Sequence, residues 1–451
     1  MENFLHLNFS PMKYITIILF GIIGFSCHQP EETLEITQPK DYTQFLQSDI
    51  SHSAKVISLE KEAEFWQKKI QQQPNGFTYV QKLATLHRQQ FELTGKIEYL
   101  HHSDSLFKLA NGMLRGKRQL GNFIALSSNA IQQHEFQKAL DYSQEAYDAT
   151  DEKFGPMMMA YDAYAELGEY EAAENILLNN ANPDSFDYLV RLSKYLDQIG
   201  NLDSAIRVME QAVHLPSRKE VKPWALTHLG DLYGHAGRIQ ESYDHYLQAL
   251  QLNSDYLAPL RGIAWIAYAH DQKVAEAEVI LQAILRKTNL PDTYLFLAEI
   301  AAYQGDTGKK REYLTSFVNQ ATRPQYAHMY NPYLATLYAE EFHQFDQAIE
   351  LANEVIQRRP TPQTYDLLAW VYHLQGNHQQ ALEIVQKHVE RKTSEPEVLY
   401  HLGAIYLKNG ESGQGQDYLQ EAQTAAFELG PVTISDIQEL TSSQPFLSSL
   451  W

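Results

Sequence analysis

The amino-acid sequence predicts an all-α protein, a right-handed α-solenoid of about ten helix-turn-helix repeats. Two patterns predict this class. Mostly small residues within amphipathic helical stretches recur at a spacing of 34 residues, and six glycines stand seven residues after positions of this series. The composition agrees, because Gly (22) and Pro (17) are few among the 451 residues and helix-forming residues are abundant.

Each repeat is located by one residue of its first helix, which is small in most repeats and follows an apolar residue. These markers are Ala84, Ser127, Tyr161, Ser193, Gly230, Ala264, Ala298, Ala335, Ala369 and Gly403. They are 43, 34, 32, 37, 34, 34, 37, 34 and 34 residues apart. A recurrent period between roughly 20 and 50 residues is typical of repeat arrays.

The pattern within a repeat predicts two packed helices. Apolar or small residues at repeat positions 4, 7, 8 and 11 form one face of a first helix, and positions 20, 24 and 27 form one face of a second. Between them, a glycine is expected to end the first helix in the left-handed conformation. These glycines are Gly168, Gly200, Gly237, Gly305, Gly376 and Gly410.

The repeats resemble the tetratricopeptide repeat. The clearest unit reads Leu226-x-x-Leu229-Gly230-x-x-Tyr233 and continues with Gly237, Ser242, Tyr246, Ala249 and Ser254. Two further units begin at Tyr365 and Leu402. The resemblance covers roughly residues 59–425, is strong from Phe186 onward and is weaker before it, and the boundaries of the repeats before about residue 125 stay open. It implies stacked helix pairs whose concave groove binds a segment of another protein.

The first 26 residues are interpreted as a signal peptide. Residues 14–25 are almost uninterruptedly apolar, follow Lys13 and end before the single cysteine, Cys27. This stretch is too short to span a bilayer and has the length of a secretory signal core. It resembles the lipobox of bacterial lipoproteins, although Gly24 stands where leucine is usual. The resemblance implies a lipid on Cys27; the alternative is a buried helix with a core cysteine. The position of Lys13 favours Met12 as the true start of translation.

Residues 27–58 are expected to be the lipidated N-terminus and a polar tether, with a short helix near residues 42–46. The acids Glu31 and Glu32 resemble a signal that sends lipoproteins of some gram-negative lineages to the cell surface. We therefore expect a bacterial envelope protein that is attached to the membrane only by lipid, in the outer membrane. Residues 426–451 are expected to form a solvent-facing capping helix, at Ile434–Leu440, and a tail ending at Trp451.

No motif predicts catalysis, a cofactor or a metal. The segment Gly305–Lys310 lacks the spacing of a phosphate-binding loop, and it lies between two helices. His373 and His378 have no carboxylates nearby at metal-ligand spacing. A formal net charge of −20 argues against a nucleic-acid partner, because such proteins present basic surfaces. We expect a protein that is not an enzyme.

The candidate partner site is the concave groove, which positions 2, 5, 9 and 12 of the first helices line in the tetratricopeptide family. In this sequence they hold Trp224, Asp231, Arg261, Trp265, Tyr268, Asp366, Trp370, His373 and Tyr400. Aromatic rings suit peptide recognition, but they could also pack between neighbouring repeats. For Trp265 and Trp370 the groove is favoured, because the core positions are filled without them.

Two functions are consistent with these patterns. The first is a non-enzymatic envelope lipoprotein that acts as a protein–protein interaction scaffold and holds a segment of another envelope protein. The second is a surface lipoprotein that captures a small ligand, such as a glycan, for uptake. The regular repeat spacing leaves no room for the large insertions of such uptake proteins, which favours the scaffold. The fold itself does not identify the partner.

Overall fold

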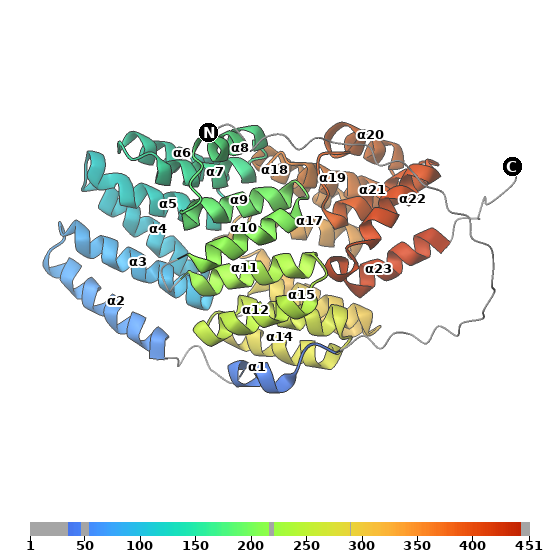
Figure 1. The fold of residues 1–451 in the computed structure, drawn as a ribbon, viewed down its shortest axis with the longest axis horizontal. Coiled ribbons are helices and arrows are strands. Elements are labelled where there is room, and N and C mark those ends of the chain that lie inside the picture. The colour runs from blue at the N-terminus through green and yellow to red at the C-terminus, as the bar shows by residue number, and fades with distance from the viewer. Residues whose placement is uncertain (1–34, 47–53, 216–220, 289, 443–451) are drawn as a thin grey trace, which may run out of the picture. The chain divides into compact units, whose positions relative to one another are not determined.

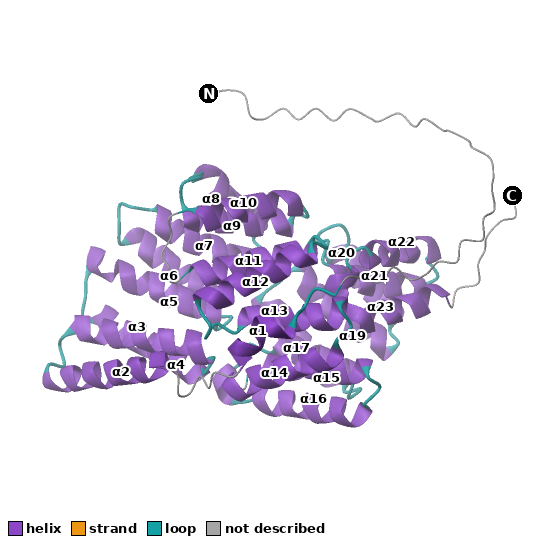
Figure 2. Ribbon diagram, turned by 60° about the horizontal axis from the view of Figure 1, so that its bottom comes forward, coloured by secondary structure: helices purple, strands orange, loops and turns teal. Residues whose placement is uncertain are grey.

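The computed structural model describes residues 35–46, 54–215, 221–288 and 290–442. The chain divides into two units, residues 1–34 and 35–451, and every described residue belongs to the second. All regular secondary structure in these described ranges is helical, as predicted (Figure 2).

Ten helix pairs make up most of the second unit. The first helices are α3 (Phe77–Thr94), α5 (Leu120–Gln132), α7 (Phe154–Glu166), α9 (Phe186–Gln198), α11 (Lys222–His235), α13 (Ala258–Trp265), α15 (Pro291–Tyr303), α17 (Asn331–Glu340), α19 (Pro362–Gln375) and α21 (Pro396–Lys408). The second helices are α4 (Ile97–Gly112), α6 (Phe136–Asp148), α8 (Tyr170–Asn179), α10 (Leu202–His214), α12 (Ile239–Leu252), α14 (Val274–Thr288), α16 (Thr307–Ala321), α18 (Phe345–Arg358), α20 (His378–His388) and α22 (Ser412–Gln423). One predicted marker lies in each first helix, so the described structure confirms the repeat register.

The markers are buried where the two helices of a pair approach each other. A Cβ added at Gly403 would lie 2.5 Å from the Leu419 side chain and 3.1 Å from the Gly415 carbonyl oxygen. At Ser127 the side-chain hydroxyl instead donates a hydrogen bond to the Ala139 carbonyl, 2.8 Å away. At markers such as Gly403, backbone and side chains of the second helix therefore occupy the space that a larger group would need.

The predicted left-handed turn is present in every repeat that carries the glycine, with φ between 69° and 93° at the six predicted positions. Three repeats without that glycine place another residue in this conformation. His134 has φ 55°, Gln272 has φ 56° and His343 has φ 53°. The same turn is therefore kept, with some backbone strain, where glycine is lacking.

Three short helical segments lie among the helix pairs. The 3₁₀ helices η2 (Gly116–Gln119) and η4 (Pro324–Tyr326) lie in the longer intervals that follow the first and seventh markers. The π-helix η3 (Ile266–His270) continues α13. The left-handed residue of this repeat, Gln272, comes eight residues after the marker Ala264, and His343 likewise comes eight residues after Ala335.

Early repeats contact late repeats, which the sequence did not predict. The guanidinium of Arg359, after α18, lies 3.0 Å from the Glu166 carboxylate at the end of α7. The ring of His101 on α4 is 2.8 Å from the carbonyl oxygen of Gln325 in η4. The array therefore curls until its first repeats meet repeats farther along the chain, which encloses the inner face more than an open groove would.

The N-terminal part of the second unit is packed rather than a free tether, which corrects the expectation for residues 35–46. Helix α1 (Pro39–Leu46) lies against α12 and α14, with Tyr42 buried among their apolar residues (Figure 1). The Asp271 carboxylate accepts hydrogen bonds from the Ile36 and Thr37 amides, at 3.1 and 2.7 Å. The next helix, α2 (Ala54–Gln72), begins five residues before the expected position.

The last helix, α23 (Ala426–Ser442), also differs from the solvent-facing cap that we expected. It kinks at Gly430, which is followed by Pro431, and it contacts α11, α15, α21 and η3 (Figure 1). Phe427 packs onto the apolar cluster around α13, and Ile437 is fully buried. The apolar residues of α23 therefore face the inner helices rather than solvent.

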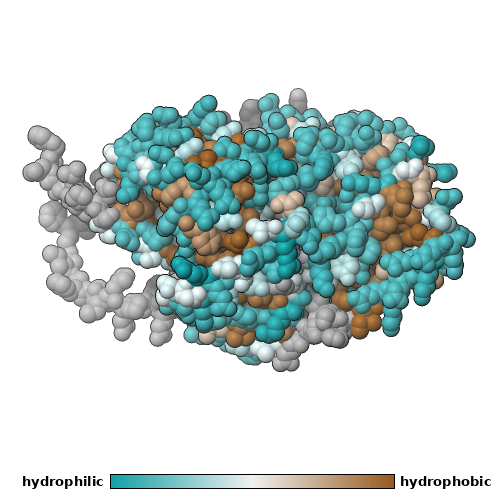
Figure 3. Space-filling view, turned by 180° about the vertical axis from the view of Figure 1, so that it is seen from behind, coloured by the Kyte–Doolittle hydropathy of each residue, from teal (hydrophilic) through white to brown (hydrophobic). Residues whose placement is uncertain are grey.

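On the face drawn in Figure 3, hydrophobic areas are interrupted by hydrophilic ones. Among the described residues, no helix has the length and apolar character to cross a membrane. Those residues also contain no group of three or more metal-ligand side chains suited to a metal ion. The predicted signal peptide, Met12, Cys27 and the tail at Trp451 lie outside the described residues.

Candidate functional site: a cavity on the inner face

A cavity of about 490 Å³ lies between α11, α13, α15, α17 and α23. Its walls come largely from repeat positions 2, 5 and 9 of three consecutive first helices. These residues are Thr227 and Asp231; Ala258, Arg261 and Trp265; and Asp292, Leu295 and Glu299. The positions that line the groove in the tetratricopeptide family therefore also line this cavity. Asp231, Arg261 and Trp265 were predicted and are brought together.

Trp265 is half-buried at the centre of this wall. Its ring packs against Phe296, with centroids 5.2 Å apart, and its indole N–H donates to the Phe427 carbonyl oxygen at 2.8 Å. Gly430 has φ 76°, and a Cβ there would lie 2.9 Å from the indole ring. Helix α23 therefore covers one side of Trp265 and closes the inner face into a pocket.

The polar groups of the cavity are mainly carboxylates. Arg261 pairs with Asp292, with 2.8 Å between nitrogen and oxygen. Asp231 accepts a hydrogen bond from the Tyr246 hydroxyl at 2.7 Å. Burial raises the pKa of Glu299 to about 7, and burial also raises the pKa of Glu428. The cavity thus combines aromatic walls with more acids than bases.

Two predicted groove residues lie near the inner face but not in the cavity wall. Trp224 is half-buried and makes an edge contact with His228, with ring centroids 4.3 Å apart. Tyr400 is half-buried beside Trp370, at 5.6 Å between centroids. A segment bound in the cavity would therefore contact Trp224 and Tyr400 only at its ends.

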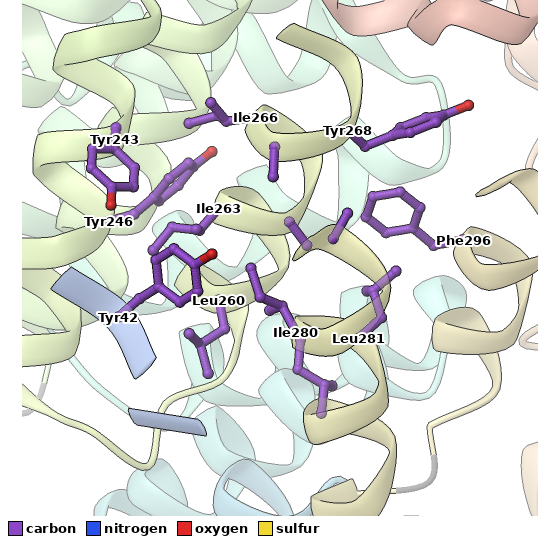
Figure 4. Packing of buried hydrophobic residues seen from close by; sticks show 14 of the residues in the cluster. Tyr42, Tyr243, Tyr246, Leu260, Ile263, Ile266, Tyr268, Ile280, Leu281 and Phe296 are labelled. Atoms are coloured by element: carbon purple, nitrogen blue, oxygen red, sulfur yellow. The ribbon is translucent and has the colours of Figure 1, made fainter. Parts of the chain in front are cut away.

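Four other predicted groove residues, Tyr268, Asp366, Trp370 and His373, are buried, which corrects their placement on an open surface. Tyr268 lies in the π-helix η3 and is fully buried, with its ring 5.6 Å from the Trp265 ring between centroids. Its ring packs against Phe296 in the apolar cluster of Figure 4.

The other three belong to a buried polar cluster between α19 and α21. The Trp370 ring is stacked between His373 and His401, with centroids 5.0 and 4.0 Å away. Asp366 lies 2.7 Å from the His401 ring nitrogen, and burial lowers the pKa of His373 to about 4. This cluster joins neighbouring repeats. Trp370 therefore packs between repeats, which was the alternative to a place in the groove.

Several cavity residues were not among the predicted ones. Asp292 and Glu299 occupy positions 2 and 9 of the repeat marked by Ala298, so the same rule would have found them. Tyr333 lies on α17 away from positions 2, 5, 9 and 12. Phe427 and Glu428 come from α23, and no local pattern indicated that this helix would fold onto the inner face.

Comparison with known families supports the repeat assignment. Residues 341–422 match the family described as anaphase-promoting complex, cyclosome, subunit 3, and residues 225–256 match the family described as tetratricopeptide repeat. No curated protein matches the chain. With the helix pairs described above, the two family matches support a tetratricopeptide-repeat protein with an all-α solenoid fold.

Several solved structures are similar to the chain. A tetratricopeptide repeat protein from Parabacteroides merdae has 16% identity and a TM-score of 0.34, covering 57% of this chain and 99% of that one. Yeast Tom70 has 12% identity and a TM-score of 0.34, covering 83% and 97%. A human IFIT1 dimer with PPP-AAAA has 13% identity and a TM-score of 0.43, covering 86% and 100%.

Proposed function

We propose that this protein is a non-enzymatic interaction scaffold that binds a segment of another protein on its inner face, with the cavity around Trp265 as the centre of the contact. Tetratricopeptide repeats generally mediate protein–protein interaction. The observation that carries the proposal is the cavity itself, because three consecutive repeats contribute their inner positions to one concave, partly aromatic wall.

The exposure of individual residues supports the same site. Tyr333 lines the cavity and keeps 51% of its surface exposed, and Arg261 is exposed as well. An aromatic ring that is accessible and yet borders a cavity offers a large contact area with little loss of side-chain entropy. A bound segment would cover Tyr333 and continue toward Trp224 or Tyr400.

The location of the scaffold is also part of the proposal. The signal-like residues 14–25 and Cys27 support a lipoprotein of the bacterial envelope, held at the membrane by lipid alone, and the partner would be another envelope protein. The test of the anchor is the mass of the N-terminal peptide. A lipid-modified Cys27 peptide is expected, and an unmodified peptide that begins before Cys27 would exclude the anchor.

The scaffold proposal is tested by site-specific photocrosslinking in cells. A photoreactive residue replaces Tyr333 in the cavity wall, and a matched control replaces Val279, which is 58% exposed on the second helix α14. We expect a defined protein adduct from position 333 that is absent from position 279. Equal adducts at both positions, or adducts only at position 279, would refute binding at the inner face.

A further inference from the structure

We propose that the cavity beside Trp265 receives a basic side chain, lysine or arginine, of the bound segment. This inference rests on the proposed function and deepens it, because it names the chemistry of the residue at the centre of the contact. Nothing in the family matches specifies a basic ligand.

The balance of charge in the cavity is the first observation. Asp231, Asp292, Glu299 and Glu428 line it, whereas the basic groups are Arg261 and His235. Arg261 is already paired with Asp292. A bound ammonium or guanidinium group would therefore meet carboxylates that lack a lysine or arginine partner among the cavity residues.

The surroundings of Glu299 are the second observation. Its carboxyl group lies between the cavity and η3, and Glu397 of α21 adds a further negative charge nearby. The Tyr268 hydroxyl is fully buried beside the Glu299 carboxyl group, and Figure 4 shows it pointing away from the apolar cluster. Burial raises the pKa of Glu299. A bound cation would lower this pKa again, because a nearby positive charge favours the ionised carboxylate.

The shape and the apolar walls are the third observation. Trp265, Phe296, Phe427 and Tyr333 surround the carboxylates. A lysine or arginine side chain has an apolar stem and a charged end, so it would place its methylene groups between these rings and its charge near Glu299. A volume of about 490 Å³ accommodates such a side chain together with neighbouring atoms of the segment.

Small probes test this chemistry without a known partner. The full chain is titrated with Nα-acetyl-lysine amide, with the arginine analogue, and with the norleucine analogue, which keeps the stem but has no charge. Ligand-observed NMR measures binding. We expect the two basic probes to bind at least about tenfold more tightly than norleucine, as for charge-assisted contacts in a partly dry site.

Two variants test whether the basic probes bind beside Glu299. Glu299→Gln keeps the shape of the side chain. It is expected to lower the affinity for the lysine probe by about tenfold and to leave the affinity for the norleucine probe unchanged. Glu350→Gln, an exposed carboxylate on α18, is the matched control for lost charge and should not change either probe. Equal binding of lysine and norleucine, no binding of the basic probes, or equal effects of the two variants would overturn the inference.

The probe experiment and the crosslinking experiment can fail independently of each other. If position 333 crosslinks a partner but the lysine probe neither binds nor competes with it, the basic side chain is wrong and the scaffold stands. If the probe binds through Glu299 but no partner crosslinks at position 333, the cavity chemistry stands and the scaffold fails.

Discussion

Replacing Glu299 by glutamine should stabilise the protein at neutral and alkaline pH but not in acid. Burial raises the pKa of Glu299 from 4.5 to about 7 in the folded protein. The folded state therefore holds a proton that the unfolded chain has released between these pH values. The resulting stabilisation is full below pH 4.5 and is lost as the pH rises through about 7, which leaves a buried carboxylate destabilising the fold at higher pH.

The magnitude follows from the size of this shift. One pKa unit corresponds to about 1.4 kcal/mol, so a rise from 4.5 to about 7 corresponds to about 3 kcal/mol. Glutamine has nearly the same shape as protonated glutamate. The stability gap between Glu299→Gln and the wild type should therefore grow by about 3 kcal/mol between acidic and alkaline pH.

Urea unfolding followed by circular dichroism, at about pH 5 and about pH 8, measures this gap. Glu350→Gln, at an exposed position on α18, controls for the loss of one negative charge from an acidic protein. A gap for Glu299→Gln that does not change with pH, or that changes no more than the control, would refute the account of a desolvated carboxylate in the cavity.

Other substitutions test the packing. Gly403→Ala should destabilise by about 1–3 kcal/mol, because its Cβ would lie 2.5 Å from Leu419, and an unchanged melting temperature would contradict the close approach. Trp370→Ala should cost about 3–5 kcal/mol in urea unfolding, whereas a small loss would return Trp370 to an open groove. Asp271→Ala should remove the amide protection of residues 36 and 37 in hydrogen exchange; retained protection would show that other contacts hold this segment. His343→Gly should raise stability by about 1 kcal/mol by relieving a left-handed residue, and a lower melting temperature would refute that strain.

Most of the fold could be predicted because the repeat is a local pattern. Each marker records a close contact between two helices that are adjacent in sequence, and each turn glycine records one backbone conformation. Such information lies within about one period of the chain. The exceptions are also local: His134 and His343 adopt the glycine conformation, so the turn is retained although its usual residue is absent.

The candidate site was predicted only in part, because contacts across the array leave no periodic signal. The rule for inner positions found Trp265, Arg261 and Asp231, and its extension to the next repeat gives Glu299. It could not show that Tyr268 would be buried, that His401 would cover Trp370, or that α23 would return to the inner face. These outcomes depend on residues far apart in sequence.

The central claim is that a partner segment occupies the cavity, and filling the cavity tests it most directly. Ala258 is an exposed residue of the cavity wall at the start of α13, and Ala275 is another exposed alanine, on the second helix α14. The affinity of the segment crosslinked at position 333 is measured, as a synthetic peptide, for Ala258→Trp and Ala275→Trp. We predict at least about a tenfold loss for Ala258→Trp and no change for Ala275→Trp. Wild-type affinity in the Ala258→Trp protein would contradict the claim.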